Sequence, residues 1–506
     1  MNDRSSGYIT ELEYLRGYYA DLSPPRIRLA LLKAGLPVPE IATACELGFG
    51  LGDTIGIHAT TSAVDWYGTD LNPAHVVRAQ KLMQAAGTAI HLYQDNIVDF
   101  SARDDLPDFD FIGLNGVWSW VSSDVRLSIV EFVRKRLKVG GVLYMSYNTL
   151  PGWAPLMPLR ELLVLHAKLA GKQDTPFLER VDDAIAFAEN LLKVMPGYAA
   201  DNPAVVARLA RIRGEDKRYV AHEYFNQHFC PMDFPTVTSL LVPAQLTYAG
   251  SADIGNLESV RLSRSQRALL RGIDDRTYRE FVRDLLVDQS LRRDYWVKGP
   301  LVPIEAGKRD ILLRRTRVVA VTPRPDLHPK LQMALALNGS GLTEKIYRPI
   351  LDLLADLAPI TLDTIERALQ STGATLDQIF DAVLVIAGHE QLAPTLEPEA
   401  TSALRERTRK LNALLLDASR SSDGLDCLAS PLTGTGVPVA RLHQLCLLAR
   451  REGMATPEAW AAFAKEHPPR DTDKDWVQGT QIPAFVEKAR LFAQNHLPLL
   501  KTLGIE

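Results

Sequence analysis

Three glycines alternate with apolar residues in the segment 43–52, TACELGFGLG, and an acidic residue, Glu46, stands two positions before the first of them. Glycines at 48, 50 and 52 let the backbone adopt positive φ and let a ligand approach the main chain without an intervening Cβ. A dinucleotide fingerprint needs its third glycine at the position of Asp53, and a Walker loop needs a Gly-Lys-Ser/Thr sequence that is absent. The segment therefore predicts a ligand-binding glycine turn of another kind, with a turn that binds nothing as the alternative.

An acidic residue also ends the second apolar segment of the chain. Residues 66–71 read as a buried strand, and Asp70 lies 18 residues after Gly52. In a βαβ unit, an acid about 20 residues past the glycines can accept hydrogen bonds from the hydroxyls of a ribose. The same carboxylate can instead cap a helix, because Pro73 suits the first turn of one. The glycines, the spacing and the placement at a strand end together favour a ribose-binding role.

Polar residues follow three further segments that read as strands. Asp95 and Asn96 follow the third, Asn115 the fourth and Asn148 the fifth. Because ligands of open parallel sheets bind outside the carboxyl ends of the strands, these residues are candidates for the same site. Asp95 can accept a hydrogen bond from the amino group of an adenine, and an Asx-type turn is an equally good interpretation.

The elements that position these residues alternate between strand and helix along the first 150 residues. A strict alternation of this kind requires a mostly parallel sheet covered on both faces, a doubly wound, Rossmann-like α/β fold. The predicted strands are 43–47, 66–71, 90–93, 109–114 and 142–147, and the predicted helices are 27–34, 53–59, 73–86 and 124–137, the last closed by Gly140 and Gly141.

The middle of the chain adds to this sheet. Residues 155–213 read as helices, which we interpret as a lid inserted after the fifth strand, and residues 219–226 read as extended chain. Two later segments, 245–249 and 293–297, read as strands that join the same sheet. Further helices are expected over 234–241 and within 263–291, and prolines at 300, 303, 323 and 325 precede the C-terminal part.

The C-terminal part differs in composition and pattern. Three helices follow one another over 343–357, 361–369 and 375–388, the last opening on a capping box, and 391–394 reads as a short β-wing. This pattern predicts a winged-helix-like module within a mainly helical region. Residues 331–506 carry 17 Lys and Arg against 22 Asp and Glu, so contact with protein is favoured over contact with DNA. We expect three domains, at 1–160, 161–328 and 329–506.

Composition restricts the class of protein. The chain has 506 residues and a net charge of −4, which disfavours a nucleic-acid partner. No run of 18 apolar residues occurs, and the first residues have no signal-peptide pattern. The four cysteines form no CxxC pair, which favours a reducing cytoplasm and no metal site. The sequence leaves a homodimer open. The cysteines are Cys45, Cys230, Cys427 and Cys446.

Four segments resemble a bacterial family of class I methyltransferases that carry a methyltransferase regulatory domain. They are CELGFGLG at 45–52, GVWSW at 116–120, SYNTLPGW at 146–153 and AHEYF at 221–225. The family includes protein-lysine methyltransferases that act on rickettsial outer-membrane proteins. The resemblance implies S-adenosylmethionine as the cofactor. The cofactor-binding residues that we expect are Glu46, Gly48, Gly50, Gly52, Asp70, Asp95, Asn96 and Asn115.

The resemblance also implies an active-site wall from residues 115–120 and 148–153. Relatives often carry His at the position of Asn115, and many carry Gln-Thr-His-Pro where this chain has Leu-Ser-Pro-Pro at 22–25. Both differences lie where we expect the methyl acceptor to bind. The resemblance to the family therefore indicates the cofactor more directly than it indicates the methyl acceptor.

A lysine acceptor has to lose a proton from an ammonium whose ordinary pKa is about 10.4, and desolvation lowers that pKa. We expect Asn115 or Asn148 to accept the amine's hydrogen bond and His222 or Glu223 to act as general base. A structural histidine or a surface ion pair is the alternative for the last two. The aromatic residues expected to line the acceptor pocket, each of which can equally be core, are Trp118, Trp120, Tyr147, Trp153 and Tyr224.

The sequence thus predicts a protein-lysine N-methyltransferase. Two alternatives stay open: a methyltransferase acting on a small molecule or glycan precursor, and a cofactor-binding scaffold without turnover.

Overall fold

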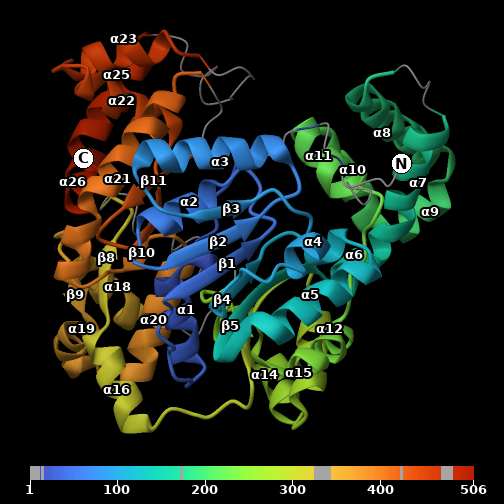
Figure 1. The fold of residues 1–506 in the computed structure, drawn as a ribbon, viewed down its shortest axis with the longest axis horizontal. Coiled ribbons are helices and arrows are strands. Elements are labelled where there is room, and N and C mark those ends of the chain that lie inside the picture. The colour runs from blue at the N-terminus through green and yellow to red at the C-terminus, as the bar shows by residue number, and fades with distance from the viewer. Residues whose placement is uncertain are drawn as a thin grey trace.

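The computed structural model describes residues 9, 12, 16–170, 175–323, 344–421, 425–468 and 482–506. A seven-stranded sheet occupies its centre, in the order β3-β2-β1-β4-β5-β7-β6 (Figure 1). The strands are β1 (Thr43–Leu47), β2 (Asp65–Thr69), β3 (His91–Tyr93), β4 (Phe109–Leu114), β5 (Leu137–Asn148), β6 (Leu246–Ser251) and β7 (Leu291–Lys298).

Strands β1 to β5 are parallel, and β7 pairs antiparallel with both β5 and β6. The predicted mostly parallel sheet is confirmed, and the two late strands do belong to it. Because the five parallel strands run in one direction, the residues that follow them meet at one edge of the sheet.

Helices cover both faces of the sheet, and alternate residues of each strand bury against them. Ala44, Phe111 and Tyr144 face one hydrophobic core, whereas Cys45, Ile112 and Leu143 face the other. This alternation is what the pleat of a strand imposes. The helices of this part are α1 (Pro24–Lys33), α2 (Asp53–Thr60), α3 (Pro73–Ala86), α4 (Ile97–Ser101), α5 (Ser123–Arg136) and α12 (Phe234–Leu241).

Two predictions about local structure were wrong. Residues 219–226 were expected to be extended, but Lys217–Tyr224 is helix α11, capped by the Asp216 side chain, which accepts from the Arg218 N–H. Its buried residues Val220, Ala221 and Tyr224 have the spacing of one helix face, which prevails over the strand preference of the local composition. The second error concerns α5, which ends at Arg136.

Gly140 and Gly141 do not close α5, because β5 already begins at Leu137. Gly140 has a φ of +81°, and the register between β4 and β5 shifts between Phe109 and Phe111. A β-bulge of this kind needs the conformational freedom that glycine gives.

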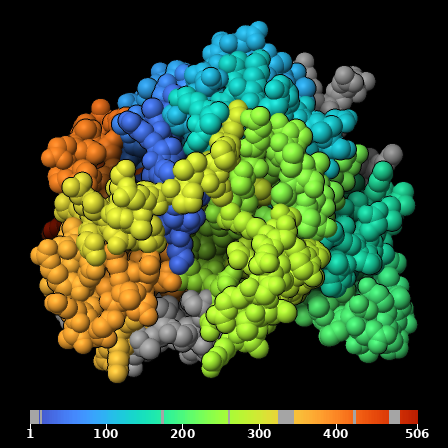
Figure 2. Space-filling view, turned by 90° about the horizontal axis from the view of Figure 1, so that it is seen from below, coloured from blue at the N-terminus to red at the C-terminus, as the bar shows by residue number. Residues whose placement is uncertain are grey.

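The predicted helical insertion after β5 is confirmed. Its helices pack around their own hydrophobic core, which also takes in residues of α11. Figure 1 shows these helices at the end of the molecule opposite to the C-terminal region, and Figure 2 shows the same separation from below. The helices of this part are α6 (Leu150–Trp153), α7 (Met157–Leu169), α8 (Phe177–Val194), α9 (Pro196–Asp201) and α10 (Pro203–Arg213).

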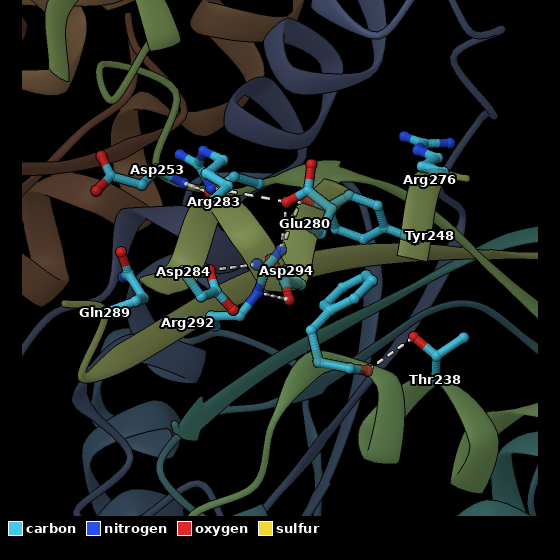
Figure 3. Close-up of polar contacts among 12 residues, drawn as sticks. Thr238, Tyr248, Asp253, Arg276, Glu280, Arg283, Asp284, Gln289, Arg292 and Asp294 are labelled. Carbon is cyan, nitrogen blue, oxygen red and sulfur yellow. Dashed lines mark hydrogen bonds and ion pairs between the residues drawn. The ribbon is translucent and has the colours of Figure 1, made fainter. Parts of the chain in front are cut away.

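A buried ionic cluster fastens β7 to the helices before it. The Arg292 guanidinium donates to Asp294 Oδ2 and Asp284 Oδ1, both at 2.7 Å, and to Glu280 Oε2 at 3.0 Å (Figure 3). It also lies 4.3 Å over the ring of Phe234. One cation thus compensates three buried carboxylates from one helix and one strand. The helices of this segment are α13 (Glu258–Arg261), α14 (Arg264–Arg271) and α15 (Arg276–Leu286).

The chain continues through helix α16, the helices α18, α19 and α20, and a small antiparallel sheet ordered β10-β8-β9. The three predicted helices are present, and α20 opens on the predicted capping box of Thr375 and Gln378. The predicted start at Thr343, Pro325 and the predicted boundary between residues 328 and 329 lie outside the described residues. The elements are α16 (Ala306–Arg315), β8 (Arg317–Ala320), α18 (Glu344–Leu354), β9 (Ile360–Thr361), α19 (Leu362–Ala368), α20 (Leu376–Gly388) and β10 (Leu392–Pro394).

Described residues after 397 pack directly on the helices that follow the glycine turn. Ile57 of α2 and Met83 of α3 share one hydrophobic core with Leu411, Leu415 and Val437. The C-terminal region is therefore continuous in packing with the central sheet layer. Its elements are α21 (Pro398–Ala418), β11 (Cys427–Ser430), β12 (Thr435–Pro438), α22 (Arg441–Arg451), α23 (Pro457–Lys465), α25 (Ile482–Leu491) and α26 (Leu497–Thr502).

Across the described parts of the chain, every helix is either too short or too polar to cross a membrane.

Candidate functional site

A cavity of about 620 Å³ opens at the carboxyl edge of the parallel strands. This volume lies within the range of small-molecule sites. Its walls come from the turns after β1, β2, β3 and β4, from residues 17 and 19 near the N-terminus, and from α11. The predicted residues that line it are Glu46, Gly48, Gly50, Asp70, Asp95, Asn96, Asn115, Trp120, His222 and Glu223.

The glycine turn has the left-handed backbone that its sequence predicts. Gly48, Gly50 and Gly52 have φ values of +73°, +59° and +79°. A Cβ on Gly52 would lie 2.5 Å from Ala79 Cβ, and one on Gly48 would lie 2.7 Å from Val117. At Gly50 a Cβ would meet nothing within 4 Å. Gly48 and Gly52 are thus required by packing, whereas Gly50 leaves room at the cavity wall for a ligand.

Glu46 is a buried acid whose carboxylate has an atom with no partner. Its Oε2 is buried and makes no hydrogen bond, although the residue lines the cavity. Burial, and then the charge of Asp70, raise the pKa of Glu46 to about 8. A buried polar atom without a partner is costly, so a cationic ligand group at this position would be stabilised by the carboxylate.

Asp70 holds the glycine turn in place. Its Oδ2 accepts from the Gly50 N–H at 2.9 Å, and its Oδ1 accepts from the Asn72 N–H at 2.9 Å. His75 Nδ1 lies 3.2 Å from the same Oδ1. The N-terminal cap of α3, which was the alternative role for Asp70, is provided by Asn72, whose side chain accepts from the Ala74 N–H. A carboxylate has about four acceptor positions, so Asp70 keeps capacity for one ligand hydroxyl.

The acid after β3 is already engaged by a neighbour. Asp95 Oδ2 accepts from Arg103 Nη1 at 3.1 Å, and the Arg103 guanidinium lies 4.3 Å over the Tyr93 ring. Asn96 caps α4, its Oδ1 accepting from the Asp99 N–H. The Asx-type role considered for Asp95 is therefore performed by Asn96.

The amide of Asn115 is oriented by the end of β5. Its Oδ1 accepts from the Tyr144 hydroxyl at 3.0 Å and from Ser146 Oγ at 3.1 Å, and Ser146 Oγ accepts from the Gly116 N–H at 2.7 Å. With Oδ1 occupied twice, Asn115 presents its N–H₂ group as a donor. The predicted role as acceptor for the amine is therefore not compatible with this hydrogen bonding.

Helix α11 contributes the wall opposite the glycine turn. His222 Nε2 lies 3.2 Å from the Leu12 carbonyl, which can only accept, so the neutral imidazole carries its proton on Nε2. Burial lowers the pKa of His222 to about 4, which makes it a weak base. Asn226 donates from Nδ2 to the His222 carbonyl, and its Oδ1 accepts from the Ile9 N–H.

The cavity is acidic. Six of the described residues that line it are Asp or Glu, and none of them is Lys or Arg. Arg16 and Arg78 reach it only indirectly, through ion pairs with Asp53 at 2.8 and 3.0 Å. A low-dielectric cleft lined by one sign of charge concentrates ligands of the opposite sign. The site thus favours cationic ligands.

Several predicted site residues lie outside the cavity. The Tyr147 hydroxyl donates to Asp294 Oδ2 at 2.8 Å, beneath the sheet edge. Asn148 ends β5, but its backbone is bonded to Ser119 and Met232. Gly152 packs on Ser290, so the expected wall at 148–153 faces the turn before β7. The predicted residues that the structure places in packed surroundings and not at the cavity are Gly52, Trp118, Tyr147, Asn148, Trp153 and Tyr224.

The segment 22–25 does not reach the cavity either. Leu22 and Ser23 are fully buried, and Leu22 packs against Gly113 in the hydrophobic core. Tyr19, three positions earlier, lines the cavity instead.

Sequence reasoning missed residues that come from outside the strand ends. Their side chains reach the cavity through tertiary packing, with no periodicity or motif to indicate them. Only Thr54 and His75, which open the helices after the glycine turn and Asp70, had a positional signal. The lining residues that the sequence did not indicate include Tyr19, Thr54, His75 and Asn226. Within the described ranges, no group of three His, Cys, Asp or Glu residues is placed to hold a metal ion.

The chain matches known proteins along its whole length. Residues 216–298 match the family model of a predicted methyltransferase regulatory domain. An uncharacterized protein of Synechocystis sp. is 33% identical over 515 residues, which cover 99% of each chain. An uncharacterized protein of Rickettsia prowazekii is 27% identical over 231 residues, 43% of this chain and 41% of its own.

The fold matches that of a solved rickettsial protein. PKMT2 from Rickettsia typhi superposes with a TM-score of 0.67 at 18% identity, covering 97% of this chain and 99% of that one. The structure of PKMT2 in complex with AdoHcy gives a TM-score of 0.64 at 17% identity. At this identity the likeness establishes a common fold, which includes the C-terminal region as well as the sheet.

Proposed function

We propose that this chain, which belongs to the family of class I methyltransferases that carry a methyltransferase regulatory domain, transfers the methyl group of S-adenosylmethionine to the side-chain nitrogen of a lysine in a protein. The cofactor and the enzymatic activity follow the family. The lysine acceptor is our further step.

The observation that carries the proposal is the Glu46 carboxylate, buried beside the glycine turn with one oxygen lacking a partner. S-adenosylmethionine carries an ammonium and a sulfonium, and either can compensate that oxygen. The ribose and adenine need a close approach to the backbone at Gly50, an acceptor at Asp70 and polar groups at Asp95 and Asn96. The residues present fit this cofactor.

The cofactor supplies a methyl carbon bonded to a positively charged sulfur. In the transfer, the lone pair of the acceptor nitrogen forms the N–C bond, and the electron pair of the S–C bond remains on sulfur. The protein's task is therefore to align the acceptor, which alone can lower the barrier by about 7–11 kcal/mol. The acceptor nitrogen has to be neutral, and the ammonium proton leaves to solvent beforehand.

The charge of the cavity supports a cationic acceptor. Asp70 and Asp99 attract a lysine ammonium into the cleft, and none of the described lining residues is Lys or Arg. Asp53 and Asp95 are paired with arginines, and Glu46 is largely protonated below pH 8 in the empty protein. A phosphate-bearing or carboxylate acceptor would be repelled by Asp70 and Asp99.

We propose further that the three-part division at 1–160, 161–328 and 329–506 reflects cofactor binding, the cover over the site and protein contact. The helices α18, α19 and α20 with strands β8 and β10 support a winged-helix-like module within the last part. The four unpaired cysteines support a cytoplasmic location.

The test is transfer of a radiolabelled methyl group. Purified protein and labelled S-adenosylmethionine are incubated with the total protein and, separately, the small-molecule fraction of an expression-host lysate. We expect label in protein, released as methyl-lysine on acid hydrolysis. At a cofactor concentration below the wild-type dissociation constant, a Gly50→Ala variant should transfer at least tenfold less label. Label confined to the small-molecule fraction would overturn the lysine assignment.

A further inference from the structure

Tyr19 brings an aromatic hydroxyl into the cavity from outside the sheet. It lines the cavity and is 40% exposed. Its backbone N–H donates to Thr54 Oγ1 at 3.2 Å. Arg16, three residues earlier, makes a bidentate ion pair with Asp53, with Nη2 donating to Oδ1 at 2.8 Å and Nε to Oδ2 at 2.9 Å. The segment that carries Tyr19 is thus fastened to the start of α2, immediately after the glycine turn.

Tyr19 and Asn115 line the same cavity. Burial, and then the charges of Glu223 and Glu46, raise the pKa of Tyr19, while a hydrogen bond from the Asn115 side chain lowers it. This is the direction expected when the amide donates, and it agrees with the two hydrogen bonds that Asn115 Oδ1 already accepts. The Tyr19 oxygen can therefore serve as a hydrogen-bond acceptor at the cavity wall.

Glu223 lines the same cavity from another element. It lies on α11, within the residues that match the regulatory-domain model. The titratable groups whose charges act on Tyr19 are Glu223, Glu46 and, from β5, Tyr144. The segment that matches the methyltransferase regulatory domain therefore contributes the acidic residue Glu223 to the lining of the cavity.

We propose that the Tyr19 hydroxyl and the Glu223 carboxylate together hold the acceptor nitrogen, and so position it for methyl transfer. The inference rests on the proposed function and deepens it. An amine that attacks carbon through its lone pair needs acceptors for its remaining N–H groups. Glu223 provides a carboxylate and Tyr19 an oxygen lone pair. Asn115 presents an N–H₂ group, and the Nε2–H of His222 is bonded to the Leu12 carbonyl. The regulatory domain is on this basis part of the acceptor site.

The first experiment compares two neighbouring tyrosines. Tyr19→Phe keeps the ring and removes the oxygen proposed to contact the acceptor. Tyr18→Phe is the matched control, since the Tyr18 hydroxyl is bonded to His58 at 3.0 Å and does not line the cavity. With lysate protein and labelled cofactor, we expect Tyr19→Phe and Glu223→Gln to lower the transfer rate at least tenfold. The AdoHcy dissociation constant should stay within about twofold, and Tyr18→Phe should transfer normally.

The second experiment has a readout other than activity. n-Butylamine, which reproduces the lysine side chain, is titrated calorimetrically into the AdoHcy complex. We expect the wild type and Tyr18→Phe to bind it, and Tyr19→Phe and Glu223→Gln to bind it at least fivefold more weakly. Equal binding by all four proteins, or an equal loss of AdoHcy affinity in Tyr19→Phe, would overturn the assignment of these two residues.

The two levels of inference fail differently. If the wild type places no label on lysine, or binds AdoHcy but not n-butylamine, the proposed acceptor class is wrong and this inference with it. If the wild type methylates lysine and Tyr19→Phe does so at the wild-type rate, the proposed function stands and only the Tyr19 contact is wrong.

Discussion

Glu46 illustrates how a single side chain couples ligand binding to pH. Its pKa of about 8 in the empty protein lies above the ordinary value of 4.5, because burial and Asp70 disfavour the charged form. The folded protein therefore binds more protons than the unfolded chain between these two pH values. The favourable contribution of the neutral carboxyl is complete below about pH 4.5 and is lost as the pH rises through 8.

We expect S-adenosylmethionine to bind more tightly as the pH rises from 6 to 8, because its cationic groups pair with the ionised Glu46. The dissociation constant should fall by up to about tenfold per pH unit, the limit for linkage to one proton. Glu46→Gln should bind more weakly at pH 8 and show little of this pH dependence. It should also melt at a higher temperature than the empty wild type above pH 8. Calorimetry and thermal melting over this range provide the measurement, and an unchanged pH profile in the variant would exclude Glu46 as the titrating group.

Neighbouring glycines of the turn give a second prediction at this scale. Gly50→Ala adds a Cβ that meets nothing within 4 Å, so its cost to folding is limited to the positive φ, about 1 kcal/mol. The new methyl group lies where the ligand approaches, and AdoHcy affinity should fall at least tenfold. Gly52→Ala, whose Cβ would lie 2.5 Å from Ala79 Cβ, should instead lower the melting temperature strongly. The same effect of both variants on melting would contradict this division of roles.

Strand β7 is held in place by charged side chains of the strand itself and of helix α15. Arg292 compensates Asp294 on its own strand and two acids on α15 (Figure 3). Tyr147 of β5 donates to Asp294 from the neighbouring strand. Burial raises the pKa of Asp284 to about 6, and the charge of Asp294 adds to this rise, whereas Arg292 and Arg283 oppose it. The cluster lies beneath the strands whose ends carry Ser146 and Asn115.

We expect Arg292→Met to lower the free energy of unfolding by about 3–5 kcal/mol, because it leaves buried carboxylates without their cation. Arg134→Met is the control. Its partner Glu131 is on the surface of α5, and an exposed pair of that kind contributes little to stability because water screens it. Urea unfolding followed by circular dichroism measures both. Similar losses in the two variants would show that the buried cluster contributes no more than a surface pair.

At the scale of the whole molecule, the described C-terminal region is joined to the sheet domain by hydrogen bonds and by a shared hydrophobic core. Thr61 after α2 donates to the Gly434 carbonyl at 3.0 Å, and Arg407 donates to the Ser62 carbonyl at 2.8 Å. Together with the core shared by α2, α3 and α21, these bonds place the C-terminal region against the back of the cofactor-binding half.

We therefore expect unfolding in urea to be a single transition, with AdoHcy binding and helix content lost at the same concentration. A chain ending at residue 397 should lose AdoHcy binding, because Ile57 and Met83 would be exposed to water. Binding by a folded chain of that length, or a separate early transition in the full-length protein, would show that the C-terminal region is energetically independent.

The sequence alone determined the glycine turn, the acid after β2 and the parallel sheet, because these depend on local backbone requirements and on strand–helix alternation. It also located the polar strand ends at Asp95, Asn96 and Asn115, since parallel strands share one carboxyl edge. The tertiary structure decided which aromatic residues are core and which reach the cavity. Trp118 and Tyr147 follow or end strands as expected, yet packing and a hydrogen bond to Asp294 turn them away.

Contacts between residues distant in sequence lay beyond what local patterns can predict. Tyr19 reaches the cavity only because Thr54 and Asp53 fasten its segment to α2. Helix α11 read as a strand because its composition suits either structure, and only the apolar face that packs on the insertion made it helical. The chemistry of the acceptor site was thus set by tertiary contacts, while the chemistry of the cofactor site was already present in local sequence.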